Sequence, residues 1–133
     1  MQQENQFEQI GLNGYKKYQV IYIAGPYRDD RGEYYVRQNI RRAEAAALSV
    51  WQNGGVAICP HKNSSGLNGA LGIQDDVWLY GYLELLRRSD AIWLLESWQN
   101  SQGATMEMEF ARRNDIPLFY TERDVIEFLT LEA

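Results

Sequence analysis

The chain alternates between short, mainly apolar runs and longer segments in which apolar residues recur every three or four positions. The short runs are typical of buried strands, and the longer spacing is typical of helices that bury one face. The predicted strands span residues 19–24, 56–59, 90–95 and 116–120. The predicted helices span residues 34–52, 75–88, a segment around 103–111, and 121–129. Strand and helix therefore alternate along most of the chain.

This alternation predicts an α/β fold, a flavodoxin-like or Rossmann-like three-layer sandwich with a four- or five-stranded parallel sheet. We expect one domain over residues 18–133 and a polar, flexible arm over residues 1–17. The run 90–95 is apolar almost throughout, which is typical of a central strand. Residues 61–74 are rich in Gly, Ser and Asn and predict a long loop. Ligands in such folds bind at the carboxyl ends of the strands, so we expect the functional site at that edge.

One carboxylate in the helical segment around 103–111 has no obvious structural use. At about 100° per residue, Glu107 falls in the middle of the apolar face of this helix, whereas Glu109 points to the opposite side. The neighbours of Glu107 on the helical wheel are small or apolar: Ala104, Met106, Met108, Phe110 and Ala111. Because an unpaired buried charge is costly, we expect Glu107 either to have a partner or to stand at the wall of a polar pocket.

The turn that enters this helix predicts an anion site next to Glu107. Ser101 and Gly103 lie where free backbone N–H groups, a hydroxyl and the positive end of the helix dipole coincide. A simple helix cap would also explain them. An anion site one turn from an inward carboxylate favours a phosphorylated ligand.

Composition narrows the classes of partner. The 133-residue chain carries 13 basic and 18 acidic residues, a net charge of −5, which argues against a nucleic-acid polymer or an anionic membrane as the main partner. Cys59 is the only cysteine and His61 the only histidine. We therefore expect no disulfide within the chain, no cysteine or histidine metal cluster and no cofactor. No apolar run approaches a membrane span and the polar start does not resemble a signal peptide, so we expect a cytoplasmic protein.

Three motifs in register resemble the nucleoside 2-deoxyribosyltransferase superfamily, in particular its branch of small nucleotide N-glycosidases. They are YIAGPY at residues 22–27, ELLRRSDAIWLL at residues 84–95, and S-x-G-x-x-x-E-x-x-x-A at residues 101–111. The resemblance covers roughly residues 19–119. It rests on the order and spacing of the three motifs.

The resemblance implies roles for individual residues. Glu107 matches the catalytic glutamate that attacks the anomeric carbon of the sugar, and Tyr22 matches a tyrosine whose hydroxyl holds that glutamate in line. Gly25 matches a loop position that lets the backbone approach the substrate. Ser101 and Gly103 match the position where the nucleotide-cleaving branch binds the 5′-phosphate. The transferase branch commonly has an acidic residue in place of Ser101, so the hydroxyl favours a nucleotide ligand.

One position departs from the pattern of the family. An aspartate that assists departure of the base usually stands eight residues before Asp90, and Tyr82 occupies that position here. Asp75 lies two helical turns earlier on the same face and is the better stand-in of the acids nearby. Because two turns span about 10 Å, a helical Asp75 would not occupy the same spot.

Further candidates for substrate binding lie near the predicted strand ends. Pro26 and Tyr27 follow the first strand, and His61 and Asn63 follow the second. For His61, a pocket role and a structural role in the loop are both open. Trp98 precedes the predicted phosphate turn and is the tryptophan best placed to stack on a nucleobase.

The leading prediction is an enzyme that hydrolyses the N-glycosidic bond of a (deoxy)nucleoside 5′-monophosphate through a glycosyl-glutamate intermediate. A deoxyribosyltransferase, a nucleotide-binding sensor without activity and a purely structural subunit are the alternatives. Aromatic residues around the second predicted helix, Trp78, Tyr80 and Tyr82, together with the resemblance, predict a homodimer or a higher homo-oligomer.

Overall fold

The computed structural model describes residues 11–63, 67 and 69–131. Its centre is a four-stranded sheet in the order β2-β1-β3-β4, and every neighbouring pair of strands is parallel. The strands are β1 (Val20–Ala24), β2 (Val56–Ile58), β3 (Ala91–Leu94) and β4 (Leu118–Phe119). The predicted α/β fold is confirmed with four strands. The prediction that the third strand is central is also confirmed.

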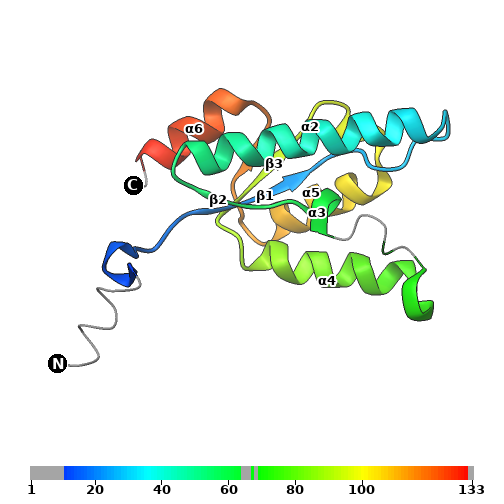
Figure 1. Ribbon diagram of the computed structural model, residues 1–133, viewed down its shortest axis with the longest axis horizontal. Helices are drawn as coiled ribbons and strands as arrows, with labels where there is room; N and C mark the ends of the chain where they lie inside the picture. Colours follow the sequence, from blue (N-terminus) through cyan, green and yellow to red (C-terminus); the bar gives the residue numbers. More distant parts are fainter. Residues whose placement is uncertain (1–10, 64–66, 68, 132–133) are drawn as a thin grey trace.

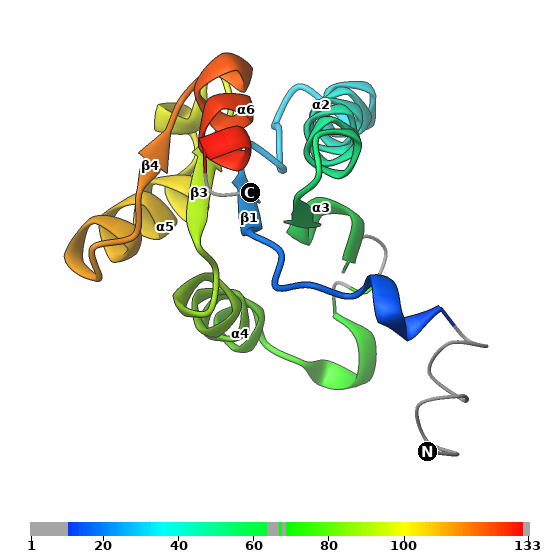
Figure 2. The same cartoon turned by 90° about the vertical axis from the view of Figure 1, so that its left-hand side faces the viewer.

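Four main helices cover the sheet on its two faces. They are α2 (Glu33–Gln52), α4 (Asp75–Arg87), α5 (Gln102–Arg113) and α6 (Glu122–Leu131). Helices α2 and α6 lie on one side of the strands and α4 and α5 on the other (Figures 1 and 2). This is the three-layer arrangement that alternating strands and helices predict.

The period-two pattern of the strands sorts their side chains between two cores. Ile21 and Ile23 of β1 pack with residues of α2 and α6, including Val50 and Leu129. The intervening Tyr22 and Ala24 belong to the other core, which holds Leu86 of α4, Ile92 and Leu94 of β3, and Ala111 of α5. The strand geometry therefore places Tyr22 on the same side of the sheet as helix α5.

Segment 61–74 is not the continuous loop that its composition predicts. The four-residue helix α3 (Pro60–Asn63) opens it, and the 3-10 turn η2 (Ala70–Gly72) follows. Elements this short contain at most one turn, so they leave no hydrophobic period in the sequence. The prediction was wrong on this point.

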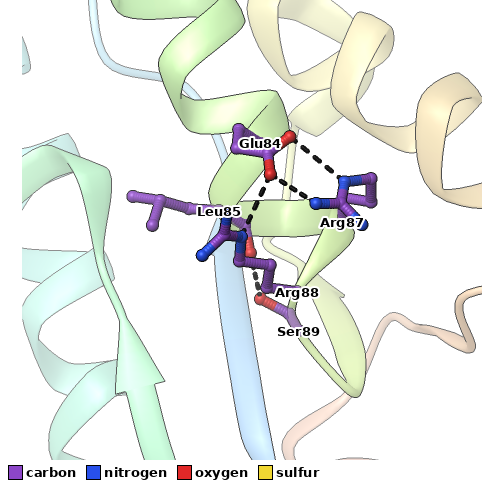
Figure 3. Close-up of polar contacts among 5 residues, drawn as sticks. All are labelled: Glu84, Leu85, Arg87, Arg88 and Ser89. Carbon is purple, nitrogen blue, oxygen red and sulfur yellow. Dashed lines mark hydrogen bonds and ion pairs between the residues drawn. The ribbon is translucent and has the colours of Figure 1, made fainter.

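Helix α4 ends in a compact polar network that leads into β3 (Figure 3). The Glu84 carboxylate accepts from both Arg87 and Arg88, and the Ser89 hydroxyl donates to the Leu85 carbonyl at 2.9 Å. Asp90 then joins β3 to β1, because its carboxylate accepts from the Val20 N–H at 2.7 Å. The polar part of the motif at residues 84–95 thus has a structural role at the end of the helix.

Near the amino terminus, residues 12–14 form a short 3-10 turn and residues 11–18 are exposed. The remainder of the predicted arm, residues 1–10, lies outside the described residues. Within the described part of the chain, no helix combines the length and the apolar character needed to cross a membrane.

Candidate active site

Glu107 lies on the inner face of α5, as the helical period predicts. Ala104 and Ala111, one turn on either side, are 1% and 0% exposed. Glu109 points outward, where its carboxylate accepts from Arg112 at 3.1 Å and from Arg113 at 2.9 Å. The prediction for Met106 was wrong, because its side chain is 43% exposed and lies outside the buried arc. Glu107 and Glu109 therefore point to opposite sides of α5, because two residues correspond to a rotation of about 200° around the helix axis.

Tyr22 is the partner of Glu107. The Tyr22 hydroxyl donates a short hydrogen bond to Oε2 of Glu107, and the tyrosine itself is fully buried. Burial raises the pKa of the Glu107 carboxyl from 4.5 to about 7, and the hydrogen bond from Tyr22 opposes this rise. Burial, followed by the neighbouring carboxylate, raises the pKa of Tyr22 well above its usual value. A neutral phenol thus holds and orients a carboxyl group that titrates near neutral pH.

Glu107 lines a pocket of about 200 Å³ at the carboxyl edge of the sheet. Segments far apart in the sequence form its wall: the turn after β1, helix α3 after β2, one face of α4, and the start of α5. The predicted site residues in this wall are Tyr27, Gly25, His61, Asp75, Ser101, Gly103 and Glu107. The predicted convergence of the strand ends is therefore observed in the fold.

Ser101 caps helix α5, and its oxygen accepts from the Ala104 N–H at 3.1 Å. The hydroxyl hydrogen remains available for a ligand because the cap uses only the oxygen as acceptor. Helical geometry leaves the N–H groups of Gln102 and Gly103 without acceptors inside the helix. A side chain at Gly103 would meet only Ser101 Oγ, at 3.9 Å, so the approach to this turn is open. Ser101 can therefore cap the helix and help to bind an anion at the same time.

The turn after β1 is held from two sides. Nε2 of His61 lies 2.8 Å from the Pro26 carbonyl oxygen, and the Asn39 side chain donates to the Tyr27 carbonyl at 3.2 Å. The ring centroids of Tyr27 and His61 are 5.6 Å apart in an edge-on arrangement. Gly25 serves packing as well as access, because a side chain there would approach Cβ of Leu95 to 3.0 Å. His61 therefore has a structural role in the loop, and it also lines the pocket.

Three predicted residues are placed differently from the expectation. Trp98 does not line the pocket but is partly buried against the core beside α5, with its ring centroid 6.1 Å from that of Tyr120. Asp75 lies at the rim, where its carboxylate is 71% exposed and accepts from Arg28 at 3.2 Å. Pro26 contributes its carbonyl to His61 and does not line this pocket. The side chain of Asn63 lies outside the described part of the chain.

The wall formed by α4 was only partly anticipated. Asp75, Trp78, Leu79 and Tyr82 all line the pocket. Their spacing of i, i+3, i+4 and i+7 is that of one helical face, so the sequence does contain the signal that could have found them. Tyr82, at the position where the resembled family has an aspartate, contributes an aromatic wall to this pocket.

Replacing Tyr22 with phenylalanine should raise the pKa of Glu107 further, because the hydrogen bond that favours the carboxylate is lost. Hydrogen bonds to charged groups contribute roughly 1.5–3 kcal/mol, so the change should be easily measured. Nuclear magnetic resonance of 13C-labelled glutamate side chains gives the titration directly. Tyr80→Phe, at a tyrosine 65% exposed on α4, is the matched control. An unchanged titration in Tyr22→Phe would contradict the assigned role of Tyr22.

Comparison with curated proteins finds no match to the chain. A family model described as a domain of unknown function (DUF7768) matches residues 19–121. The matched region contains all four strands, the turn that carries Gly25, and helix α5 with Glu107. Because the match covers well over half of the chain, the protein belongs to the DUF7768 family, which is described as a domain of unknown function.

Proposed function

We propose that the protein hydrolyses the N-glycosidic bond of a nucleoside or deoxynucleoside 5′-monophosphate. The observation that carries this proposal is Glu107, which lines a pocket, accepts a hydrogen bond from a buried tyrosine and has a carboxyl pKa of about 7. A titratable group with this combination of burial, partner and pocket is a candidate for chemistry. The resemblance to small nucleotide N-glycosidases supplies the reaction class.

The proposed reaction has two steps. In the first, a carboxylate oxygen of Glu107 forms a bond to the anomeric carbon of the sugar while the bond from that carbon to the base nitrogen breaks. The base leaves with the electron pair and takes a proton from water. In the second step, another water molecule attacks the same carbon and gives its proton to the hydroxide left by the first step, Glu107 leaves as a carboxylate, and a sugar 5-phosphate is released. One water molecule is consumed overall.

Tyr22 has a positioning role in this scheme. Its hydroxyl is occupied by one oxygen of Glu107, which leaves the other oxygen for the attack. Because the pKa of Glu107 is about 7, the reactive carboxylate becomes the main form only above neutral pH. We therefore expect base release to increase with pH through this region.

The start of α5 is proposed to bind the 5′-phosphate. The Ser101 hydroxyl, two backbone N–H groups and the helix dipole all favour an anion there. A nucleoside 5′-monophosphate should bind at least about tenfold more tightly than the matching nucleoside, since charge-assisted hydrogen bonds contribute roughly 1.5–3 kcal/mol against about 1 for neutral ones.

Substitutions at Ser101 test the phosphate seat. Ser101→Ala should lose only part of the preference for the nucleotide, because the backbone groups remain, whereas Ser101→Asp should repel the phosphate and reverse it. Titration calorimetry on the wild type and both variants, with Thr105→Ala on the exposed side of α5 as the control, measures this. Equal affinity of the wild type for nucleoside and nucleotide would contradict the seat.

A nucleotide-binding protein without hydrolytic activity is the second candidate. It is favoured by Tyr82, which stands where the resembled nucleoside 2-deoxyribosyltransferase superfamily has an aspartate, and by the ion pair of the exposed Asp75 carboxylate with Arg28. A deoxyribosyltransferase would use the same glutamate but pass the sugar to a second base. Chromatography of a deoxynucleotide with and without an added free base distinguishes the three outcomes: a new nucleotide, free base, or no change.

The proposed assembly is a homodimer formed through α4. Of the three aromatic residues on which the prediction of an oligomer was based, Tyr80 is 65% exposed, whereas Trp78 and Tyr82 line the pocket. The other exposed apolar residues of this helix are Val77, at 57%, and Leu85, at 38%. Light scattering at micromolar concentration should give twice the monomer mass, and Tyr80→Glu should reduce it to the monomer mass. A monomeric wild type would contradict this proposal.

We expect the protein to act in the cytoplasm, in keeping with its single cysteine.

A further inference from the structure

Two polar atoms in the pocket wall have no hydrogen-bond partner among the described residues. They are Nδ1 of His61 and Nε1 of Trp78, and both are shielded from solvent. Both residues line the same pocket as Glu107. Burying a polar atom without a hydrogen-bond partner is unfavourable, so each of the two atoms calls for an explanation.

One of the two atoms is a hydrogen-bond acceptor and the other is a donor. The Pro26 carbonyl can only accept, so Nε2 of His61, 2.8 Å away, carries the hydrogen. The imidazole is neutral near pH 7 because burial lowers the pKa of His61, although hydrogen bonds to backbone carbonyls oppose the change. Nδ1 is therefore an acceptor. The indole Nε1–H of Trp78 is a donor only.

The surroundings of these atoms are aromatic. Tyr27 lies edge-on to His61, and Trp78, Leu79 and Tyr82 form the facing wall on α4. His61 is only 6% exposed, and its ring is fixed by the bond to Pro26. Such a wall suits a flat, partly apolar ring better than a sugar or a phosphate.

We propose that His61 and Trp78 read the edge of the nucleobase: His61 Nδ1 accepts from an N–H of the base, and Trp78 Nε1–H donates to a neighbouring carbonyl oxygen or ring nitrogen. The ligand class is thus a nucleotide whose base presents a donor beside an acceptor. This inference rests on the proposed nucleotide site but does not depend on hydrolysis. Both atoms are shielded from solvent, so the proposal requires the pocket wall to open locally when the base enters, while His61 keeps its hydrogen bond to Pro26.

The experiment measures binding in the Glu107→Gln background, so that turnover does not interfere. The probes are adenosine, guanosine, cytidine and uridine 5′-monophosphates, purine riboside 5′-monophosphate, which has no exocyclic donor, and ribose 5-phosphate, which has no base. Trp78→Phe keeps an aromatic ring and removes the donor. His61→Gln keeps a donor for Pro26 and an acceptor for the base, whereas His61→Leu removes both.

The best-bound natural nucleotide should lose roughly tenfold in affinity in Trp78→Phe and in His61→Leu, since one hydrogen bond of about 1.4 kcal/mol corresponds to a factor of ten. His61→Gln should retain most of the affinity. Ribose 5-phosphate should bind equally to all variants. Purine riboside 5′-monophosphate should be insensitive to His61→Leu, because it has no N–H to lose. The change in tryptophan fluorescence on nucleotide binding should disappear in Trp78→Phe.

Each other outcome overturns the proposal. Equal losses for ribose 5-phosphate and the nucleotides would show that the pair contacts sugar hydroxyls. Unchanged nucleotide affinity in both Trp78→Phe and His61→Leu would remove the pair from recognition altogether. Base release by the wild type is measured separately. If the wild type releases base but the His61 and Trp78 variants bind nucleotides normally, only the proposed base recognition is wrong. If the variants lose affinity as expected but the wild type releases no base, only the proposed hydrolytic activity is wrong.

Discussion

Replacing Glu107 with glutamine is expected to lower the rate of base release by at least about 10³-fold, because the variant lacks the charge that attacks the sugar. Glutamine keeps the shape of the side chain, and its oxygen can still accept from the Tyr22 hydroxyl. The fold and nucleotide binding should therefore remain. Single-turnover kinetics, with chromatography of the free base, measures the loss in the chemical step separately from binding.

Glu109→Gln is the matched control, on the same helix two residues away. Glu109 faces solvent, and the neighbouring Arg112 and Arg113 lower the pKa of its carboxyl to about 2. The change removes surface ion pairs, which contribute little, so base release should stay within about twofold of the wild type. Equal effects of the two substitutions would contradict the assignment of Glu107, because the assignment depends on the side of the helix each glutamate occupies.

The second large effect concerns stability and pH. The pKa of Glu107 is about 7 in the folded protein and 4.5 in the unfolded chain, so the folded state binds the proton more tightly. The free energy of unfolding therefore falls as pH rises from about 4.5 to 7 and then levels off. The difference of the two pKa values corresponds to about 3 kcal/mol, at roughly 1.4 kcal/mol per pKa unit.

The glutamine variant has no such titration. The difference in unfolding free energy between Glu107→Gln and the wild type should move in favour of the variant by about 3 kcal/mol between pH 4.5 and pH 8. Urea unfolding at both pH values measures it. Glu109→Gln should not reproduce this trend, because a carboxyl with a lowered pKa contributes stability that is lost only as pH falls toward about 2. A difference between Glu107→Gln and wild type that does not change with pH would contradict the burial of the carboxyl.

Periodicity predicted the parts of the site that lie on regular elements. The helical period separated Glu107 from Glu109, and the strand order brought Gly25, His61 and Ser101 to one edge of the sheet. These positions follow from the fixed geometry of helices and parallel strands. Tyr22 followed from the resemblance, and the two-residue period of β1 gives the physical reason for its place.

Sequence patterns did not predict the contacts of residues in irregular segments or at the ends of helices. Trp98 lies in a 3-10 turn after Ser97, whose φ of 67° is left-handed, and this turn directs the tryptophan to Tyr120 and the core. Asp75 is in the first turn of α4, at the rim of the pocket, where its carboxylate is exposed and meets Arg28. A sequence pattern does not specify such tertiary contacts. By contrast, Trp78 and Tyr82 share a helical face with Asp75, so the helical period is sufficient to place them in the same wall.

The most direct test of the central claim is the release of free base by the wild-type protein at pH 8. A panel of ribonucleoside and deoxyribonucleoside 5′-monophosphates, each paired with its nucleoside, is incubated with the protein and analysed by chromatography. The pocket around Glu107 predicts release from at least one monophosphate, faster than from its nucleoside and absent in Glu107→Gln. No release from any member of the panel, or equal release by the wild type and Glu107→Gln, would contradict the account.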